Sequence, residues 1–154
     1  MKKIIAITIM LCAISCNSPK KKQTIKPISK IAKLFNENDL LLLNYVDIDC
    51  SCGYSLIEFW ENNKSLFNKS TKVVYILCGQ EIEKFFFFID KFNYDIIYEI
   101  CTSEELISIH ENKYLSKTLL INSKFEIIIK GNVITDNKAM NSFSSYLNHN
   151  KIHI

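Results

Sequence analysis

The sequence predicts an α/β fold in which a central mixed sheet carries helices on both faces. Short apolar runs alternate with amphipathic segments along most of the chain, as expected when helices connect the strands of one sheet. The 154 residues are enough for a single domain. With only 3 Gly and 2 Pro, the composition excludes collagen-like and proline-rich disordered chains.

The first part of the domain is expected to hold three strands and their connecting helices. Residues 40–46 are apolar almost throughout and lie between two aspartates, which is typical of a strand buried on both faces. Residues 72–78 are rich in β-branched side chains and are followed by Gly79, so a second strand is expected there. The other elements expected here are helices over 28–36, 53–62 and 81–92, and a third strand over 96–100.

The last part of the domain is expected to add a helix, a β-hairpin and a final helix. Thr102 or Ser103 is a suitable N-cap for a helix that contains residues 106–110, because two glutamates follow. The remaining elements are strands over 119–121 and 125–129, a turn at Gly131 and Asn132, and a helix over 138–147 that buries Met140, Phe143 and Leu147 on one face.

The N-terminus has the pattern of an export signal. Lys2 and Lys3 precede the apolar run 4–14, which is too short to cross a bilayer core as a helix, since that takes about 20 residues. Small residues then precede Cys16, and this junction resembles the lipobox of bacterial lipoproteins. The resemblance implies that Cys16 carries a lipid. An ordinary signal peptide cleaved near Ala13 or Ser15 is the alternative, and Cys16 would then be incidental.

Three regions are therefore expected along the chain. They are a signal peptide over 1–15, a lipidated cysteine with a basic polar tether over 16–33, and a folded domain over 34–154. The lipoprotein resemblance implies a protein of the cell envelope that is anchored to a membrane through Cys16. The expected location is the outer membrane, facing the periplasm.

The charge of the chain argues against a nucleic-acid partner. The formal net charge is only +3, and all 19 basic residues are lysine. Arginine, the usual side chain for bidentate contacts to guanine and phosphate, is absent. The lysines are concentrated before residue 34, and acidic residues outnumber them in the expected domain. No polyanion site is therefore expected.

Four cysteines lie in the expected domain: Cys50, Cys52, Cys78 and Cys101. Three of them come at or just after the C-terminal ends of predicted strands, which is the edge where α/β sheets build sites. Three or four sulfurs can therefore converge there. An envelope location permits disulfides, and four cysteines allow three complete pairings, between which the sequence does not choose.

The order of elements around these cysteines is similar to the thioredoxin fold, and especially to small TlpA-like envelope thioredoxins. The resemblance is carried by residues 43–52 with Leu56 and Trp60, and by residues 118–122 with 125–129. It implies a thioredoxin-like domain with a redox site at the start of its first helix. The third strand, with the cysteine that follows it, resembles the extra β-α unit of the TlpA-like branch.

Two features depart from that family. The family carries Cys-x-x-Cys at the start of the first helix, whereas here Cys52 takes the place of the second cysteine and Asp49 that of the first. Cys50 lies one residue late, so that the motif is Cys-x-Cys. The family also has a cis-proline just before the hairpin, where this chain has Ser116 and Lys117.

Thiol–disulfide exchange is the reaction that Cys50 and Cys52 could carry out at this position, although the two departures from the family favour a non-catalytic domain. Backbone N–H groups at a helix start stabilise a thiolate. Asp47 and Asp49 oppose it, because nearby carboxylates disfavour a second negative charge. We expect Cys50 to be the attacking thiol, since it is nearer the exposed end, and Cys52 to resolve the mixed disulfide.

Other interpretations of the cysteines stay open. Cys78 or Cys101 can act as a further redox partner of the Cys50–Cys52 pair. Either can instead form a structural disulfide with Cys50 or Cys52, or be buried without a role. A site for a soft metal ion is a further alternative. However, a Cys-x-Cys motif with two scattered cysteines lacks the two Cys-x-x-Cys motifs that are typical of zinc sites. We therefore expect no metal and no cofactor.

Two functions follow. The first is a membrane-anchored, weak or specialised thiol–disulfide oxidoreductase whose partners are envelope thiol or disulfide proteins. The second is a non-catalytic thioredoxin-fold lipoprotein that binds or assembles envelope partners.

Residues 85–88 are four phenylalanines, and at least one ring should face outward because consecutive helical residues are ~100° apart. Tyr45 and Trp60 are expected in the core. His149 and His153 are expected in solvent, and His110 is expected to be exposed or hydrogen-bonded instead of acting as a base.

Overall fold

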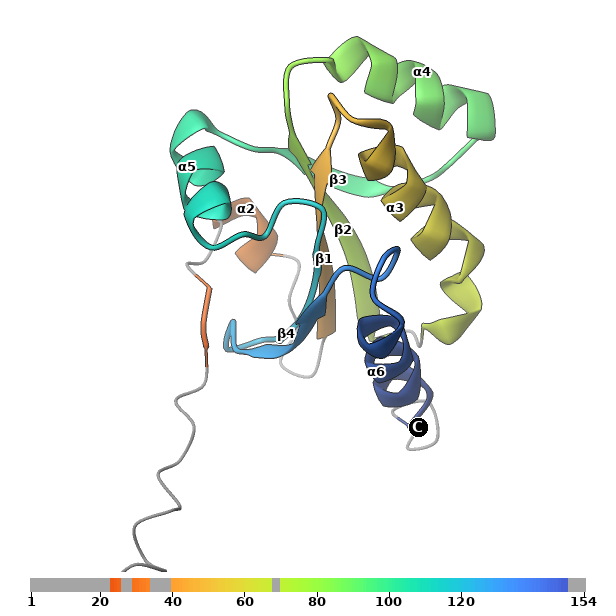
Figure 1. Ribbon diagram of the computed structural model, residues 1–154, viewed down its shortest axis with the longest axis vertical. Coiled ribbons are helices and arrows are strands. Elements are labelled where there is room, and N and C mark those ends of the chain that lie inside the picture. The colour runs from red at the N-terminus through yellow and green to blue at the C-terminus, as the bar shows by residue number, and fades with distance from the viewer. Residues whose placement is uncertain (1–22, 26–28, 34–39, 68–69, 150–154) are drawn as a thin grey trace, which may run out of the picture.

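A five-stranded sheet forms the centre of the computed structural model, which describes residues 23–25, 29–33, 40–67 and 70–149 (Figure 1). The strands lie in the order β3-β2-β1-β4-β5. β1 (Leu40–Asp47), β2 (Thr71–Cys78) and β3 (Ile97–Ile100) run parallel. β4 (Thr118–Asn122) runs antiparallel to β1, and β5 (Ile127–Gly131) antiparallel to β4. The predicted mixed sheet is thus confirmed.

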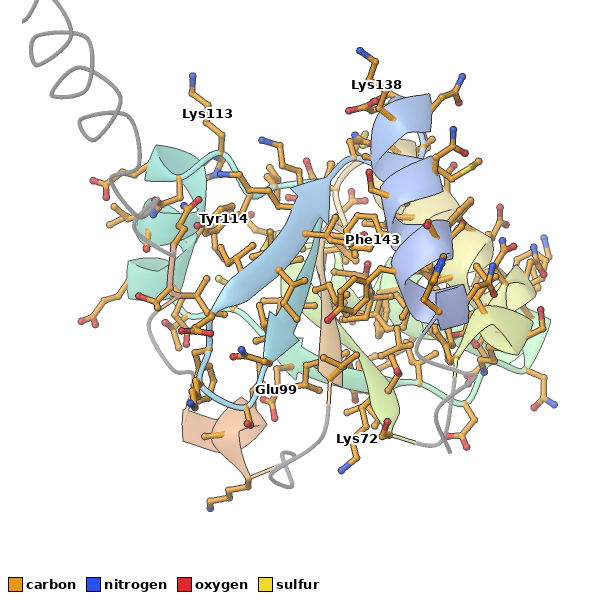
Figure 2. The ribbon with its side chains drawn as sticks, turned by 90° about the horizontal axis from the view of Figure 1, so that it is seen from below. Lys72, Glu99, Lys113, Tyr114, Lys138 and Phe143 are labelled. Carbon is orange, nitrogen blue, oxygen red and sulfur yellow. A yellow bond between two sulfur atoms is a disulfide. The ribbon has the colours of Figure 1, made fainter. Side chains whose placement is uncertain are left out.

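Helices cover both faces of this sheet, as predicted. One face carries α3 (Ser51–Asn62), the short 3-10 turn η1 (Lys64–Leu66), α4 (Ile82–Phe92) and α6 (Asn137–His149), and the other carries α2 (Ser29–Ala32) and α5 (Ser103–Glu111) (Figure 1). Each face has a core of its own. Trp60, Phe85 and Phe143 fill the α3 face, and Figure 2 shows Phe143 between α6 and the sheet.

β1 is the central strand because its side chains are buried on both faces. Residues 41–46 are all buried. Leu42 and Val46 belong to the core under α3, whereas Leu43 and Tyr45 belong to the core under α5. The apolar run in the sequence therefore serves two cores at once. The predictions that Tyr45 and Trp60 lie in the core are confirmed, with 4% and 1% of their surfaces exposed.

The hairpin and the last helix differ in detail from their predictions. β5 begins at Ile127, two residues later than the expected start at Phe125. Phe125 has a left-handed backbone with φ of 58°, and the Asn122 side chain accepts hydrogen bonds from the backbone N–H groups of Lys124 and Glu126. The turn is therefore longer than the polar residues alone indicated. In α6, Ala139 is buried where Met140 was expected.

A segment before the expected domain boundary at residue 34 also packs on the fold. Ile25 donates a backbone hydrogen bond to Phe125, and Ile127 donates one to Gln23, so that this segment lies beside β5. Ile31 of α2 is only 1% exposed. The expected signal peptide and Cys16 lie outside the described residues. Within the described ranges, no helix is long and apolar enough to cross a membrane.

Candidate functional site

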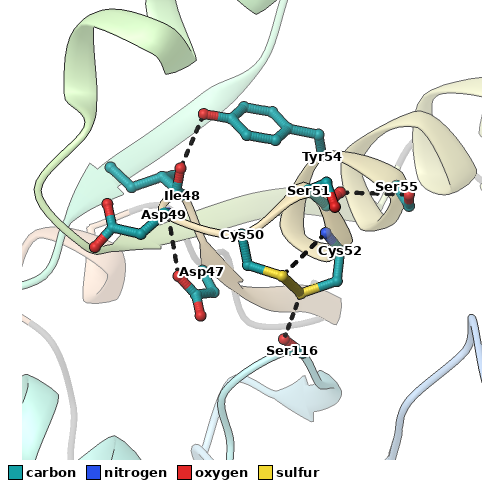
Figure 3. The surroundings of a disulfide bond; sticks show 9 residues. All are labelled: Asp47, Ile48, Asp49, Cys50, Ser51, Cys52, Tyr54, Ser55 and Ser116. Carbon is teal, nitrogen blue, oxygen red and sulfur yellow. Dashed lines mark hydrogen bonds between the residues drawn. A yellow bond between two sulfur atoms is a disulfide. The ribbon is translucent and has the colours of Figure 1, made fainter.

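Cys50 and Cys52 form a disulfide at the start of α3 (Figure 3). Their Cα atoms are 5.3 Å apart. Cys50 is the N-cap of α3, with an extended backbone, and its Sγ accepts a hydrogen bond from the backbone N–H of Cys52 at 3.3 Å. The helix begins at Ser51, earlier than the predicted Gly53, because the cysteine itself is the cap. The expectation that both cysteines lie at a helix start is confirmed.

The exposure of the two sulfur-bearing residues is the reverse of the expectation. Cys52 is exposed, whereas Cys50 is half-buried. Cys50 lies in the loop that leaves β1, and its N–H donates to the carbonyl of Asp47 at 3.3 Å. Cys52 lies in the first helical turn, and Gly53 is the residue of that turn that packs inward. The more accessible residue for an incoming thiol is therefore Cys52.

Close packing fixes the position of this helix start. A Cβ at Gly53 would lie 2.1 Å from the carbonyl oxygen of Asp47, so only glycine lets the first turn approach the end of β1. The Gly53 N–H donates to the carbonyl of Cys50 at 3.1 Å. Tyr54, one residue later, donates its hydroxyl to the carbonyl of Ile48 at 3.0 Å (Figure 3). These contacts fix the position of the disulfide relative to the end of β1.

Asp49, which precedes the Cys-x-Cys motif, ties two loops together through its carboxylate. Its Oδ1 accepts hydrogen bonds from the backbone N–H groups of Gln80 and Glu81, at 2.8 and 2.9 Å. Figure 3 shows its carboxylate directed away from the disulfide. Asp47 in turn accepts a hydrogen bond from the Asp49 N–H at 3.1 Å. The carboxylate of Asp49 therefore ties the loop after β1 to the loop after β2.

Gly79 makes that tie sterically feasible. Its φ is 137°, a region that L side chains rarely adopt, and a Cβ there would lie 2.7 Å from Asp49 Oδ1. Sequence reasoning took Gly79 only as the end of a strand and missed the Asp49 contact. The available signal was the glycine directly after Cys78, but its partner lies 30 positions earlier in the chain.

Ser116 lies beside the disulfide, close to Cys52. Its Oγ is 3.8 Å from Cys52 Sγ (Figure 3). Its backbone is left-handed, with φ of 56°, and its N–H donates to the carbonyl of Tyr45 at 2.8 Å. Tyr45 donates its own N–H to Lys117 at 3.0 Å. These bonds fix the Ser116 loop beside β1, and the described residues contain no cis peptide bond.

A buried polar network lies beneath the Ser116 loop. Trp60 Nε1 of α3 donates to Thr118 Oγ1 of β4 at 3.0 Å, and Thr118 Oγ1 donates to Asn44 Oδ1 of β1 at 2.7 Å. Asn44 and Thr118 are fully buried, and the network satisfies their polar groups. It therefore joins the helix that carries the disulfide to the strand that follows Ser116.

Cys78 and Cys101 form a separate pair of free thiols. Cys78 is the last residue of β2 and is buried, whereas Cys101 follows β3 and is half-buried. Both pack on the core under α5, the face opposite α3. Burial raises the pKa of the Cys78 thiol, and the neighbouring Cys101 adds to the shift. Burial also raises the pKa of Cys101, although the neighbouring Cys78 thiol opposes that shift.

The four cysteines are thus two pairs, instead of the single cluster that their places along the strands suggested. The disulfide that the structure holds joins Cys50 to Cys52, and neither is bonded to Cys78 or Cys101. In the part of the chain that the structure describes, no three or more His, Cys, Asp or Glu side chains are grouped so that they could hold a metal ion.

The phenylalanine run places its rings on both sides of α4. Phe85 is fully buried, whereas Phe86 is 42% and Phe87 72% exposed, so the prediction of an outward ring is confirmed. An open pocket of about 470 Å³ lies beside α4 and is lined by Tyr54, Glu83, Lys84, Phe87 and Phe88. His110 and His149 are exposed, as predicted, and His153 lies outside the described residues.

Solved structures similar to this one have thioredoxin-like folds. A thioredoxin-like protein from Parabacteroides distasonis superposes with a TM-score of 0.61 at 16% identity, over 80% of this chain and 93% of that one. A thiol-disulfide isomerase from Corynebacterium glutamicum gives 0.55 at 10% identity, over 83% and 90%. StoA from Bacillus subtilis gives 0.50 at 20% identity, over 71% and 84%.

Comparison of the sequence alone gives no match. No protein-family model matches the chain, and no curated protein matches it. The likeness is therefore carried by the arrangement of the strands and helices. Together with the mixed sheet and the disulfide at the start of α3, the solved structures show that this chain has a thioredoxin-like fold.

Proposed function

We propose that the chain exchanges thiols and disulfides at the Cys50–Cys52 pair. The observation that carries this proposal is the asymmetry of the pair. Cys52 is exposed, and Cys50 Sγ accepts a backbone N–H at a helix start. An exposed sulfur can be attacked, and a sulfur that receives an N–H bond is the better leaving group. The names of the similar structures, an isomerase among them, support the same chemistry.

The exchange proceeds in two balanced steps. An external thiolate attacks Cys52 Sγ, the S–S bond breaks, and its electron pair leaves on Cys50 as a thiolate. A second thiolate of the same substrate then attacks the substrate sulfur of the mixed disulfide and releases Cys52 as a thiolate. The substrate dithiol is oxidised to a disulfide, and the protein pair is reduced by two electrons. The reverse reaction reduces a substrate disulfide.

This scheme exchanges the roles that the sequence suggested. Cys52 carries the mixed disulfide because it is the exposed residue, and Cys50 is the resolving or leaving thiol. The helix N-terminus stabilises the Cys50 thiolate through the Cys52 N–H. Ser116 Oγ is placed to donate a hydrogen bond to a Cys52 thiolate, although the present separation of 3.8 Å is long.

Reduction of insulin by dithiothreitol tests the proposal. The full-length chain should accelerate it, and the double variant Cys50→Ser/Cys52→Ser should return the rate to the uncatalysed value. Cys78→Ser is the matched control and should retain the activity. The reduced single variant Cys50→Ser, freed of dithiothreitol and then mixed with insulin, should accumulate a mixed disulfide on Cys52. An unchanged rate in the double variant would refute the exchange function, and trapping on Cys50 in Cys52→Ser would refute the assigned roles.

A non-catalytic binding role is the second candidate. It is favoured by the exposed rings of Phe86 and Phe87 and by the pocket beside them. Exposed aromatic groups of this kind are common where partners bind. In this case the double cysteine variant would keep the cellular function, whereas a charged residue at Phe87 would abolish it.

We also propose that Cys16 is lipidated and that it anchors the chain to a membrane of the cell envelope. The supporting observation is the short apolar run that ends in small residues before Cys16. Each buried CH₂ of an acyl chain contributes ~0.8 kcal/mol to membrane binding. Cys16→Ser should lose the lipid mass and leave the membrane fraction. An unchanged mass and an unchanged fractionation would contradict the proposal.

A further inference from the structure

The ends of β2 and β3 place two cysteines side by side. The two strands are parallel, and the last paired residues are Leu77 and Ile100. The next residues along the strands are Cys78 and Cys101. The Cys101 N–H donates to the Leu77 carbonyl at 2.9 Å, so the hydrogen-bond ladder continues through this position. Cys101 therefore lies next to Cys78, on the neighbouring strand, at the C-terminal ends of β2 and β3.

The two side chains also point to the same face. Cys78 belongs to the core under α5, and Cys101 packs against that core. Each thiol donates to a nearby backbone carbonyl, Cys78 to Ile76 at 3.6 Å and Cys101 to Thr102 at 3.2 Å. Neighbouring strands lie about 4.8 Å apart, and disulfides need Cα atoms within roughly 4.4–6.8 Å. The backbone already provides the spacing that a disulfide needs.

We propose that Cys78 and Cys101 are a second redox pair, which oxidises to a disulfide that links the ends of β2 and β3. The oxidant is a small-molecule or protein disulfide, such as oxidised glutathione. This inference does not depend on the function proposed for Cys50 and Cys52, because the two pairs share no sulfur and lie toward different faces of the sheet.

The reaction begins at the more accessible thiol. Cys101 is half-buried and Cys78 is buried, so Cys101 attacks first. The Cys101 thiolate attacks one sulfur of the external disulfide and releases one thiolate. The Cys78 thiolate then attacks Cys101 Sγ and releases the second. The two cysteines lose two protons and two electrons, and one external disulfide becomes two thiols.

The cross-link would join an edge strand of the sheet to its neighbour. β3 is an edge strand of four residues, and Ile97 and Ile100 are 43% and 54% exposed. Within the described sheet, β2 is its only neighbour. A disulfide from Cys78 to Cys101 closes the loop that contains α4 and β3. It therefore lowers the conformational entropy of the unfolded chain. Oxidation should therefore stabilise this edge.

Peptide mapping of the oxidised protein tests the proposal. The full-length Cys50→Ser/Cys52→Ser variant is incubated with oxidised glutathione and quenched in acid. Its free thiols are alkylated after unfolding. We expect a linked peptide pair that contains Cys78 and Cys101, lighter by two hydrogens than the separate peptides. The thermal unfolding midpoint should rise on oxidation and return when dithiothreitol is added.

Single variants provide the control. In the Cys50→Ser/Cys52→Ser background, Cys101→Ser should remove both the linked peptide and the effect of dithiothreitol on the midpoint. The proposal is overturned if Cys78 and Cys101 remain fully alkylated in excess oxidised glutathione, or if they pair only with other cysteines. The insulin assay is unaffected by either outcome, so failure here is distinguishable from failure of the proposed exchange function.

Discussion

The two cysteine pairs lie at the same edge of one sheet, yet their surroundings differ in every respect that controls thiol chemistry. Cys50 and Cys52 lie at the start of a helix, Cys52 is exposed, and the backbone N–H of Cys52 donates to Cys50 Sγ. Cys78 ends a strand and Cys101 follows one, both lie in or against an apolar core, and their thiols donate to backbone carbonyls. Residue type alone does not decide reactivity.

The difference arises from how each strand ends. After β1 the chain runs through two further residues before Cys50, which is enough to leave the core and enter a helix. Cys78 is still part of β2, so its side chain follows the alternation of that strand into the core under α5. A shift of a few residues along a strand end thus separates a helix-start cysteine from a core cysteine.

The largest expected contrast is in alkylation rate. With the chain fully reduced and near neutral pH, limiting iodoacetamide should label Cys52 at least ~100-fold faster than Cys78. Cys78 is buried, and burial raises its pKa, so little thiolate is present and little of it is accessible. Mass spectrometry of the labelled peptides measures both rates. In denaturant the two rates should become equal, and equal rates in the folded protein would contradict the contrast.

Gly79 joins the two regions, and its substitution should destabilise both. Gly79→Ala forces a side chain into a left-handed position where the Cβ would lie 2.7 Å from Asp49 Oδ1. A strained backbone of this kind costs about 1–3 kcal/mol, which urea unfolding can measure. Gln80→Ala is the matched control, because Gln80 is exposed and keeps its backbone bond to Asp49. Equal stability of the two variants would show that Asp49 does not depend on the glycine.

A smaller effect, on the free energy of unfolding, is expected when the pH is raised above the ordinary pKa of a thiol. The pKa of Cys78 is raised in the folded state, so above its ordinary value of ~8.5 the unfolded chain loses a proton that the folded chain retains. The free energy of unfolding is therefore unaffected by this thiol below ~8.5 and falls as the pH rises above it, by up to ~1.4 kcal/mol per pH unit. Urea unfolding of Cys50→Ser/Cys52→Ser in reducing buffer checks this.

The comparison variant for this measurement carries Cys78→Ala in the same background. It should lose stability at neutral pH because a buried side chain is shortened, and it should then fall less steeply with pH. Identical slopes would mean that Cys78 does not contribute to the alkaline loss. The hydroxyl of Tyr45, whose pKa burial also raises, adds its own loss only above ~10.

The sequence by itself determined the order of the elements, the central strand and the location of the Cys-x-Cys motif at a helix start. Each of these features follows from a pattern within its own short segment of the chain. The apolar run of β1 must be buried wherever its neighbours lie, and Thr102 followed by Glu105 forms a capping box without help from other elements.

Only the tertiary structure decided which cysteines pair and which of Cys50 and Cys52 is the more exposed residue. The partner of Cys78 depends on the register between β2 and β3, and no pattern within either strand contains that register. The partner of Asp49 is a loop that follows a different strand, and the exposure of Cys52 depends on how closely Gly53 packs against β1. Each of these contacts joins separate segments, so its free energy is realised only when the whole sheet has formed.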